Sequence, residues 1–288
     1  MQSIKKNGST VKPIDNHASS MGFDSTNLEG VGQNQKFTLW SESSLGIRDI
    51  GMAVKEPFHI TEKGWMKLGG VLTITGLAFL VDNDIRGILQ RNHTPTVDNF
   101  FQIGERYGSP VIPLSVSTLM FSGGLIFQNE WSTSTGRMAL EAVAISGITS
   151  FFLKSIIARS RPVTNQGAFH FNRPSFAFVS DQDAFPSGHT TVAFALSTVF
   201  SRRIQNVWAS IGLYTLASMT ALNRMYDDRH WLSDTILGAF IGIAVANFIV
   251  DINEPNEYKI NDLDSNPLPP KVSLGFTPNG TMGLQINF

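Results

Sequence analysis

The sequence contains no cysteine, which excludes disulfide bonds and any chemistry that depends on a thiolate. It also lacks an excess of either charge, because 22 basic residues stand against 23 acidic ones. Nucleic-acid-binding chains usually have a basic excess, so that class of protein is disfavoured. The first residues, Met1-Gln-Ser-Ile-Lys-Lys, are followed by no apolar stretch and do not have the pattern of a secretory signal peptide. Either the first apolar run acts as an uncleaved anchor, or the natural chain begins further upstream.

Long apolar runs dominate the middle of the chain, although its polar ends bring the mean hydropathy to +0.01. The runs lie at residues 65–81, 110–128, 138–158, 190–200, 207–222 and 232–250. Several approach the roughly 20 residues that a membrane-spanning helix needs, and the shorter ones would also suit buried helices of a soluble bundle. We predict an all-α fold, a helical bundle of about six helices, and favour a membrane-embedded bundle on the length of the runs.

The composition divides the chain into three parts. Residues 1–62 form a polar N-terminal segment, which we expect to be partly disordered because it has little apolar surface to bury. Residues 63–252 hold the helical domain. Residues 253–288 combine an Asn-, Asp- and Pro-rich linker with a C-terminal β-hairpin, whose turn is predicted at Asn279-Gly280.

Two basic residues mark the end of the third apolar run. Lys154 and Arg161 are seven residues apart, close to two helical turns, and would project from one side of a continuous helix. Pro162 argues against a helix beyond Arg161. Two cations at a helix end can hold a phosphate dianion, and a guanidinium can do so through two parallel hydrogen bonds. The same pair could instead favour the helix macrodipole or lipid headgroups.

A Pro-Ser-Gly-His motif at residues 186–189 precedes the fourth apolar run. The free backbone N–H groups of a helix start favour an anion, and Gly188 would let the backbone come close to it. Ser187 could serve only as the N-cap, and His189 could only face solvent from the first turn. By itself, the motif does not decide between these interpretations.

A third motif joins the fifth apolar run to the sixth. His230 and Asp234 are four residues apart, so on one helix the carboxylate can hold one imidazole nitrogen and leave the other free to attack. Arg224 comes just before them and adds a third cation. A surface His–Asp pair on a helix would have the same spacing.

The order of the three motifs removes much of this ambiguity. In an up-and-down bundle, the end of the third run, the start of the fourth and the link between the fifth and sixth lie at the same end. No simple packing requirement asks for all of these residues together. We therefore predict a phosphate-binding active site at one end of the bundle.

The motifs resemble the signatures of the type 2 phosphatidic acid phosphatase superfamily, which also contains bacterial acid phosphatases and vanadium haloperoxidases. The likeness covers roughly residues 100–250. It departs at Asn223, where the family usually has serine; because asparagine can still hydrogen-bond, we expect tuning rather than loss of activity. Asp227-Asp228-Arg229 gives the same loop more charge than expected, which could alter substrate preference.

The resemblance implies a metal-independent phosphatase that works through a phosphohistidine. His230 would be the nucleophile, Asp234 would orient it, and His189 would protonate the leaving oxygen and then activate water. The groups that would hold the phosphate oxygens are Lys154, Arg161, Arg224 and the backbone N–H groups around Ser187 and Gly188. No cofactor is implied; vanadate is expected to inhibit a phosphatase of this kind, and would be a cofactor only for a haloperoxidase.

One further stretch has part of a calcium-loop pattern. It is Asp82-Asn-Asp84-Ile-Arg-Gly87, but His93 stands where the final acidic ligand belongs. We therefore interpret the stretch as a surface turn and expect no metal site.

The loop between the first two motifs is rich in phenylalanine, at positions Phe169, Phe171, Phe176, Phe178 and Phe185. These rings would suit a lipid-like substrate, or would only pack the loop down. We expect a lipid phosphate as substrate, a membrane as environment and no nucleic acid as partner. The alternatives are a soluble secreted non-specific acid phosphatase and a vanadate-dependent haloperoxidase.

The orientation in a membrane follows from two arginines at the other end of the bundle. Arg202 and Arg203 lie in the short turn 201–206, which the positive-inside tendency places in the cytoplasm. The active site would then face away from the cytoplasm. A soluble protein of this kind would instead be periplasmic or secreted.

Overall fold

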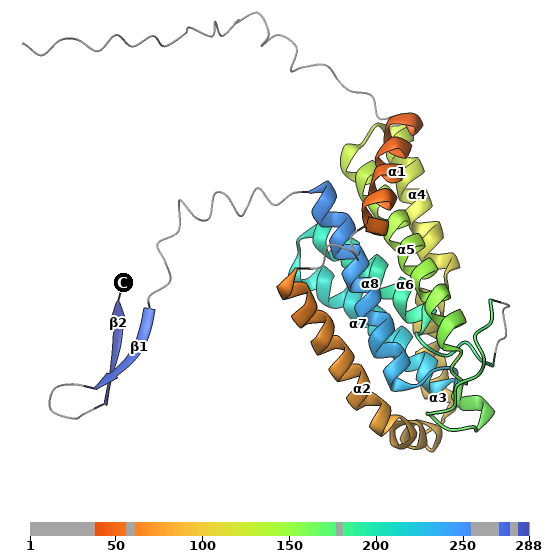
Figure 1. Ribbon diagram of the computed structural model, residues 1–288. Coiled ribbons are helices and arrows are strands. Elements are labelled where there is room, and N and C mark those ends of the chain that lie inside the picture. Colours follow the sequence, from red (N-terminus) through yellow and green to blue (C-terminus); the bar gives the residue numbers. More distant parts are fainter. Residues whose placement is uncertain (1–37, 56–60, 177–180, 255–270, 277–281, 288) are drawn as a thin grey trace, which may run out of the picture. The chain divides into compact units, whose positions relative to one another are not determined.

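The computed structural model describes residues 38–55, 61–176, 181–254, 271–276 and 282–287, and these ranges contain eight α-helices (Figure 1). The helices are α1 (Leu39–Lys55), α2 (Glu62–Gln90), α3 (Pro95–Gly108), α4 (Val111–Phe127), α5 (Glu130–Ile157), α6 (Gly188–Ile204), α7 (Val207–Tyr226) and α8 (Leu232–Asn253), with a short 3-10 turn at Pro162–Thr164. Each of the six predicted apolar runs forms one of these helices. The predicted all-α bundle is confirmed.

The apolar runs do not predict α1 and α3. Both helices mix charged with apolar residues, so neither contains a continuous apolar stretch. Local capping fixes the start of α3, where the hydroxyl of Thr94 accepts a hydrogen bond from the backbone N–H of Val97 at 3.3 Å. α1 lies within the predicted polar segment 1–62, whose residues 1–37 are outside the described ranges.

α5 and α8 form the centre of the bundle. α5 packs against α4, α6 and α8, and α8 also packs against α2 and α6. The buried core that joins these helices includes Met138, Ala142, Val192, Leu196, Val199, Ile249 and Val250. Gly242 brings α8 very close to α6, since a Cβ there would lie 2.2 Å from the carbonyl oxygen of Thr191. The starts of α6 and α8, which hold two of the predicted motifs, are therefore fixed by close helix packing.

Three of the described helices are long and apolar enough to cross a membrane, namely Glu62–Gln90, Glu130–Ile157 and Leu232–Asn253. Thr96–Gly108 and Val111–Phe127, bent by 49° at their junction, could together make a fourth span. The exposed large apolar side chains of α2 include Trp65, Met66, Leu72, Leu77 and Leu80. So large an apolar surface is unfavourable in water and is satisfied by lipid. These helices indicate a membrane protein.

A buried ion cluster attaches α1 to α5 and α8. Arg137 of α5 donates hydrogen bonds to Glu42 and Asp49 of α1, each at 2.9 Å. Its guanidinium also donates to Glu141 and to the side-chain oxygen of Asn253, again at 2.9 Å each. Because loss of one member would leave buried charge uncompensated, α1 is held firmly on the bundle.

Two strands near the end of the chain pair as the alternating pattern predicts. β1 (Lys271–Phe276) and β2 (Met282–Asn287) are antiparallel, with Val272 opposite Ile286. The predicted turn at Asn279-Gly280 and residues 255–270 of the predicted linker lie outside the described residues.

The predicted surface turn at Asp82–Gly87 is wrong. These residues lie inside α2, and Asp82 is only 1% exposed. Its carboxylate accepts hydrogen bonds from the backbone N–H of Ser233 at 3.0 Å and from the Ser233 hydroxyl at 2.6 Å. Protein donors at the start of α8 therefore account for this buried acid.

Candidate active site

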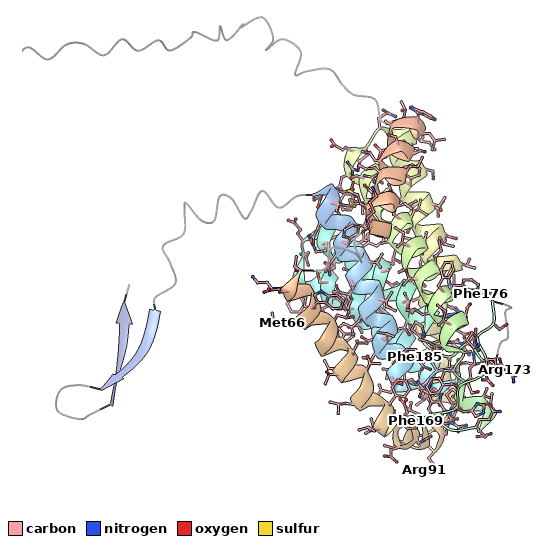
Figure 2. All side chains as sticks on the ribbon, in the orientation of Figure 1. Met66, Arg91, Phe169, Arg173, Phe176 and Phe185 are labelled. Atoms are coloured by element: carbon pink, nitrogen blue, oxygen red, sulfur yellow. The ribbon has the colours of Figure 1, made fainter. Side chains whose placement is uncertain are left out.

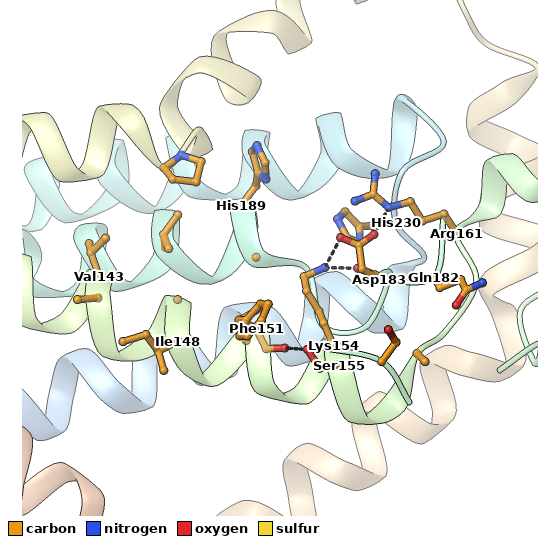
Figure 3. Close-up of a pocket in the computed structure, with 18 of the residues that line it drawn as sticks. Val143, Ile148, Phe151, Lys154, Ser155, Arg161, Gln182, Asp183, His189 and His230 are labelled. Atoms are coloured by element: carbon orange, nitrogen blue, oxygen red, sulfur yellow. Dashed lines mark hydrogen bonds and ion pairs between the residues drawn. The ribbon is translucent and has the colours of Figure 1, made fainter. Parts of the chain in front are cut away.

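The three motifs meet at one cavity of about 550 Å³. Its wall includes Lys154, Arg161, Gly188, His189 and His230. Figure 3 shows the two cations and His230 gathered around the side chain of Asp183, with His189 at the start of α6. The other predicted site residues, Ser187, Arg224 and Asp234, are buried and do not line the cavity.

The first motif reaches the cavity by a route that differs from the prediction. α5 ends at Ile157, and Ala158 takes the left-handed region with φ of 48°. Lys154 is therefore in the last turn of the helix, whereas Arg161 belongs to the loop that follows. Pro162 disfavours a helical conformation of the residue before it, which explains why one helix cannot present both cations.

The carboxylate of Asp183 pairs with Lys154 and Arg161, the two cations of this motif. Its carboxylate accepts a hydrogen bond from Nε of Arg161 at 2.7 Å, and its second oxygen lies 4.0 Å from Nζ of Lys154. The Lys154 ammonium also donates to the backbone carbonyl of Asp183. A phosphate that binds here must compete with this carboxylate, and the sequence motifs give no sign of it.

The second motif begins α6, with Ser187 as N-cap. The Ser187 side chain makes no capping hydrogen bond to the backbone; its hydroxyl is 2.9 Å from that of Thr190. Its backbone N–H donates to the carbonyl oxygen of Asp234 at 2.9 Å. Ser187 thus ties α6 to α8, while Gly188, the first residue of the helix, lines the cavity.

His189 and Arg224 are both buried among positive charges. Burial, followed by the positive charges of Arg224, Lys154 and Arg161, lowers the pKa of His189 to about 3. Arg224 is 8% exposed, and its Nε has no hydrogen-bond partner among the described residues. A bound anion would relieve both features, because it would supply the missing acceptor and offset the positive charge.

His230 is held in one orientation by a backbone group. Its Nδ1 lies 2.7 Å from the carbonyl oxygen of Ala184, which can only accept, so Nδ1 carries the proton and Nε2 keeps its lone pair. Asp234 was the predicted orienting group, but its Oδ2 is 3.5 Å from Nδ1 and accepts instead from the N–H of Trp231 at 2.7 Å. Burial and the nearby cations hold the pKa of His230 well below its usual value, so the ring is neutral.

The two departures from the family pattern lie behind the cavity. The amide nitrogen of Asn223 donates to Asp227 at 3.0 Å, while its buried side-chain oxygen has no partner in the described parts of the chain. Asp228 accepts two hydrogen bonds from Arg86 of α2, both at 2.7 Å. The charges of this loop are thus largely used to attach it to neighbouring residues.

The loop phenylalanines pack against helices. Phe169, Phe171 and Phe185 surround Phe79 of α2, with ring centroids 5.5 to 6.5 Å from it. The ring centroid of Phe176 lies 6.4 Å from that of Phe152 of α5. Figure 2 labels Phe169, Phe176 and Phe185 at the end of the bundle that holds the motifs. None of the four described loop phenylalanines lines the cavity, which favours the packing interpretation; the fifth, Phe178, lies outside the described residues.

Arg159 is a further residue that the motif reasoning misses. It is fully buried and donates to Asp234 at 2.5 Å and to Asp82 at 2.7 Å. An arginine between Lys154 and Arg161 in a basic stretch is easily taken for a phosphate ligand. Only its burial between carboxylates distinguishes it from Arg161. In the part of the chain that the structure describes, no group of three or more His, Asp or Glu side chains is arranged to hold a metal ion.

Two known proteins are similar in sequence to parts of this chain. The lipid A 1-phosphatase of Porphyromonas gingivalis is 34% identical over 115 residues, which cover 37% of this chain and 26% of that protein. The lipid A 4′-phosphatase of the same organism is 24% identical over 158 residues, 55% of this chain and 66% of that protein. The chain thus spans less than two thirds of the length of either relative.

Among solved structures, the transmembrane PAP2-type phosphatidylglycerolphosphate phosphatase of Bacillus subtilis has a similar fold. The match covers 65% of this chain and 96% of that one, with a TM-score of 0.52 and 16% identity. Residues 136–258, which contain all three motifs, match the sequence profile of the PAP2 superfamily. The part of the chain that forms the candidate active site therefore belongs to the PAP2 superfamily.

Proposed function

We propose that the chain is a metal-independent phosphatase that hydrolyses a phosphomonoester or pyrophosphate of a lipid through a phosphohistidine intermediate. The observation that carries the proposal is the mixed lining of the cavity. It includes Lys154, Arg161 and both histidines, together with the apolar residues Leu114, Val143, Ile148, Phe151 and Val192. Cations suit a phosphate, and the apolar residues suit the hydrocarbon part of a lipid. The names of the two relatives support a phosphorylated lipid as the substrate class.

His230 acts as the nucleophile in this proposal. Its Nε2 forms the bond to phosphorus while the bond from phosphorus to the leaving oxygen breaks; neutral His189 takes the proton that the substrate carries as a phosphate monoanion and passes it to that oxygen. In the second step, His189 removes a proton from water, the water oxygen attacks phosphorus, and the bond to Nε2 breaks. His189 returns its proton to the inorganic phosphate, which leaves, and His230 is again neutral with its proton on Nδ1.

The cations stabilise the charge that builds on the phosphoryl oxygens. Lys154 and Arg161 reach the cavity directly, and Arg224 contributes a buried guanidinium whose Nε lacks a partner within the described ranges. Charge-assisted hydrogen bonds of this kind act strongly in a buried site because little water screens them. Side chains thus supply the positive charge that a metal ion provides in other phosphatases.

The decisive experiment measures phosphate release by the full chain, purified in detergent, from lipid and soluble phosphomonoesters and pyrophosphates. We expect release from lipid substrates, inhibition by vanadate, and loss of release in His230→Ala. His93→Ala is the matched control, because it replaces a histidine that does not line the cavity and should keep most of the activity.

Three outcomes would overturn the proposal. Full activity in His230→Ala would exclude a phosphohistidine intermediate at this residue. Equal activity on soluble esters, in protein that fractionates without detergent, would indicate a soluble acid phosphatase. Halide oxidation that requires vanadate, without phosphatase activity, would indicate a haloperoxidase.

A further inference from the structure

A buried arginine joins two buried carboxylates directly behind the nucleophile. Arg159 donates from one terminal nitrogen to Asp82 at 2.7 Å and from the other to Asp234 at 2.5 Å. All three side chains are at most 1% exposed. The guanidinium also donates through Nε to the carbonyl of Ala168 at 2.8 Å and lies 4.0 Å above the ring centroid of Phe79. With the Ser233 hydroxyl, four of its five N–H groups have acceptors within the protein, so Arg159 is committed to these contacts and not to a substrate phosphate.

The same group fixes the start of α8. The hydroxyl of Ser233 accepts from Arg159 at 2.7 Å and donates to Asp82 at 2.6 Å, and the Ser233 N–H donates to the other oxygen of Asp82. Asp82 comes from α2, Arg159 from the loop after α5, and Ser233 and Asp234 from α8. Three separate segments thus meet at Ser233 and Asp234, which follow His230 by three and four residues in the chain.

The charges of this group do not cancel. One guanidinium lies between two carboxylates, so the group carries a net negative charge where little water reaches it. If Arg159 paired with Asp234 alone, the pair would be neutral. Asp82 places a second negative charge behind Asp234, and Arg159 balances only one of the two, so negative charge remains beside Nδ1 of His230, which lies 3.5 Å from Oδ2 of Asp234. The imidazole becomes cationic as its Nε2 bonds to phosphorus, and a nearby buried anion stabilises that cation.

We propose that Asp82 and Arg159 are positioning residues that act through Asp234: Arg159 holds the Asp234 carboxylate in place, and Asp82 holds the guanidinium and adds the negative charge that stabilises the phosphohistidine. This inference rests on the proposed function. It assigns to α2, which lies outside the matched residues 136–258, a part in the chemistry of the site.

The test compares Asp82→Asn with Ser233→Ala in the purified full chain. Asp82→Asn keeps the size and an acceptor oxygen but removes the charge. Ser233→Ala removes two hydrogen bonds of the same group and keeps every charge. We expect Asp82→Asn to lower kcat about tenfold to a hundredfold, the range typical of an outer-shell partner, with little change in KM because the cations of the cavity remain. Rapid quenching with radiolabelled substrate should show less phosphohistidine, whereas Ser233→Ala should stay within a few-fold of the unaltered chain.

Wild type and His230→Ala are measured beside these variants, so an inactive wild type would refute the proposed function and not this inference. An unchanged kcat in Asp82→Asn would refute the inference alone. The inference would also be refuted if Asp82→Asn and Ser233→Ala lowered kcat equally and lowered Tm equally. That result would indicate a purely structural role for the group. If Asp82→Asn does not fold, Arg159→Lys replaces it: the charge stays but the fork that holds both carboxylates is lost, and the same selective fall in kcat is expected.

Discussion

At the scale of single residues, the cavity binds a carboxylate of its own chain before any substrate arrives. Asp183 accepts from Arg161 at 2.7 Å and lies 4.0 Å from the Lys154 ammonium. Its side chain is 30% exposed, so it can swing away from the cations at modest cost. The cations are thus paired in the free state, which keeps their side chains ordered but makes every anion compete for them.

This competition predicts that Asp183→Asn binds phosphate-like anions more tightly. Removing a negative charge that lies 2.7 Å from Arg161 and 4.0 Å from Lys154 should lower the inhibition constant of vanadate or inorganic phosphate by about tenfold. Inhibition of phosphate release measures it. Asp84→Asn, the same change on an exposed position of α2, should leave the inhibition constant as it was. A loss of activity with no tighter inhibition would mean that Asp183 contacts the substrate instead.

The pKa of His189 makes a prediction about pH. Burial and the cations lower this pKa to about 3, so above that pH the ring is neutral in the free enzyme and has no proton to give. The proton must then arrive on the substrate, as a phosphate monoanion. Since the second pKa of a phosphate ester is about 6, kcat/KM should fall about tenfold per pH unit above that value. At pH values below the usual histidine pKa the enzyme should stay active, because the lowered pKa of His230 keeps this nucleophile neutral there.

Initial rates between pH 4 and 9 check this dependence. An aryl phosphate is the control substrate, since its leaving group departs without a proton and His189→Ala should slow its phosphoryl transfer far less. A kcat/KM that stays level through pH 8 for an alkyl ester would contradict the assignment of His189 as the acid.

Sequence reasoning at this scale found the residues of the three motifs and missed Asp183, Arg159 and Asp82, which contact them from other segments. Lys154, Arg161, His189 and His230 belong to spaced motifs, and spacing can be read from a chain. Asp183 acquires its role only because a loop folds back onto two cations. No local pattern records such a contact between segments.

At the scale of helices, close packing of α6 on α8 sets the geometry between the two histidines. His189 begins α6 and His230 precedes α8, and the two helices touch at Gly238 and Gly242. Apolar runs predicted both helices. They could not predict α1 and α3, because amphipathic helices take their stability from a packed face that the sequence does not show as a continuous run.

Gly242→Ala tests this contact. The new Cβ would lie 2.2 Å from a backbone oxygen of Thr191, which cannot yield as a flexible side chain does. We expect a destabilisation of about 1–3 kcal/mol, as for overpacking in general, and a fall in kcat as α6 shifts. Thermal unfolding in detergent and kcat measure the two effects. Gly76→Ala in α2, with nothing within 4 Å of the added carbon, is the control and should change neither. Equal Tm values for both variants would show that the helices can separate freely.

At the scale of the whole molecule, the spans and the site together describe a protein that works at a membrane surface. α2, α5 and α8 are long and apolar enough to cross a membrane, and the cavity combines apolar and cationic walls. The run lengths predicted the spans, since 18 or more apolar residues is a strong local signal. The side on which the site opens is a different question, because charge at the site end has a second explanation in phosphate binding.

We propose that the active site faces away from the cytoplasm, on the basis of Arg202 and Arg203, which were predicted in a turn and lie in the last turn of α6. The absence of cysteine permits a direct test by single-cysteine labelling. Arg173→Cys places an exposed thiol in the loop after α5, and Val207→Cys places one at the start of α7, at opposite ends of the bundle. In spheroplasts, a membrane-impermeant maleimide should label Arg173→Cys at once and Val207→Cys only after the membrane is opened. The cysteine-free parent should stay unlabelled throughout. The reverse pattern would show that the active site faces the cytoplasm. Immediate labelling of both variants would show that the bundle does not span the membrane.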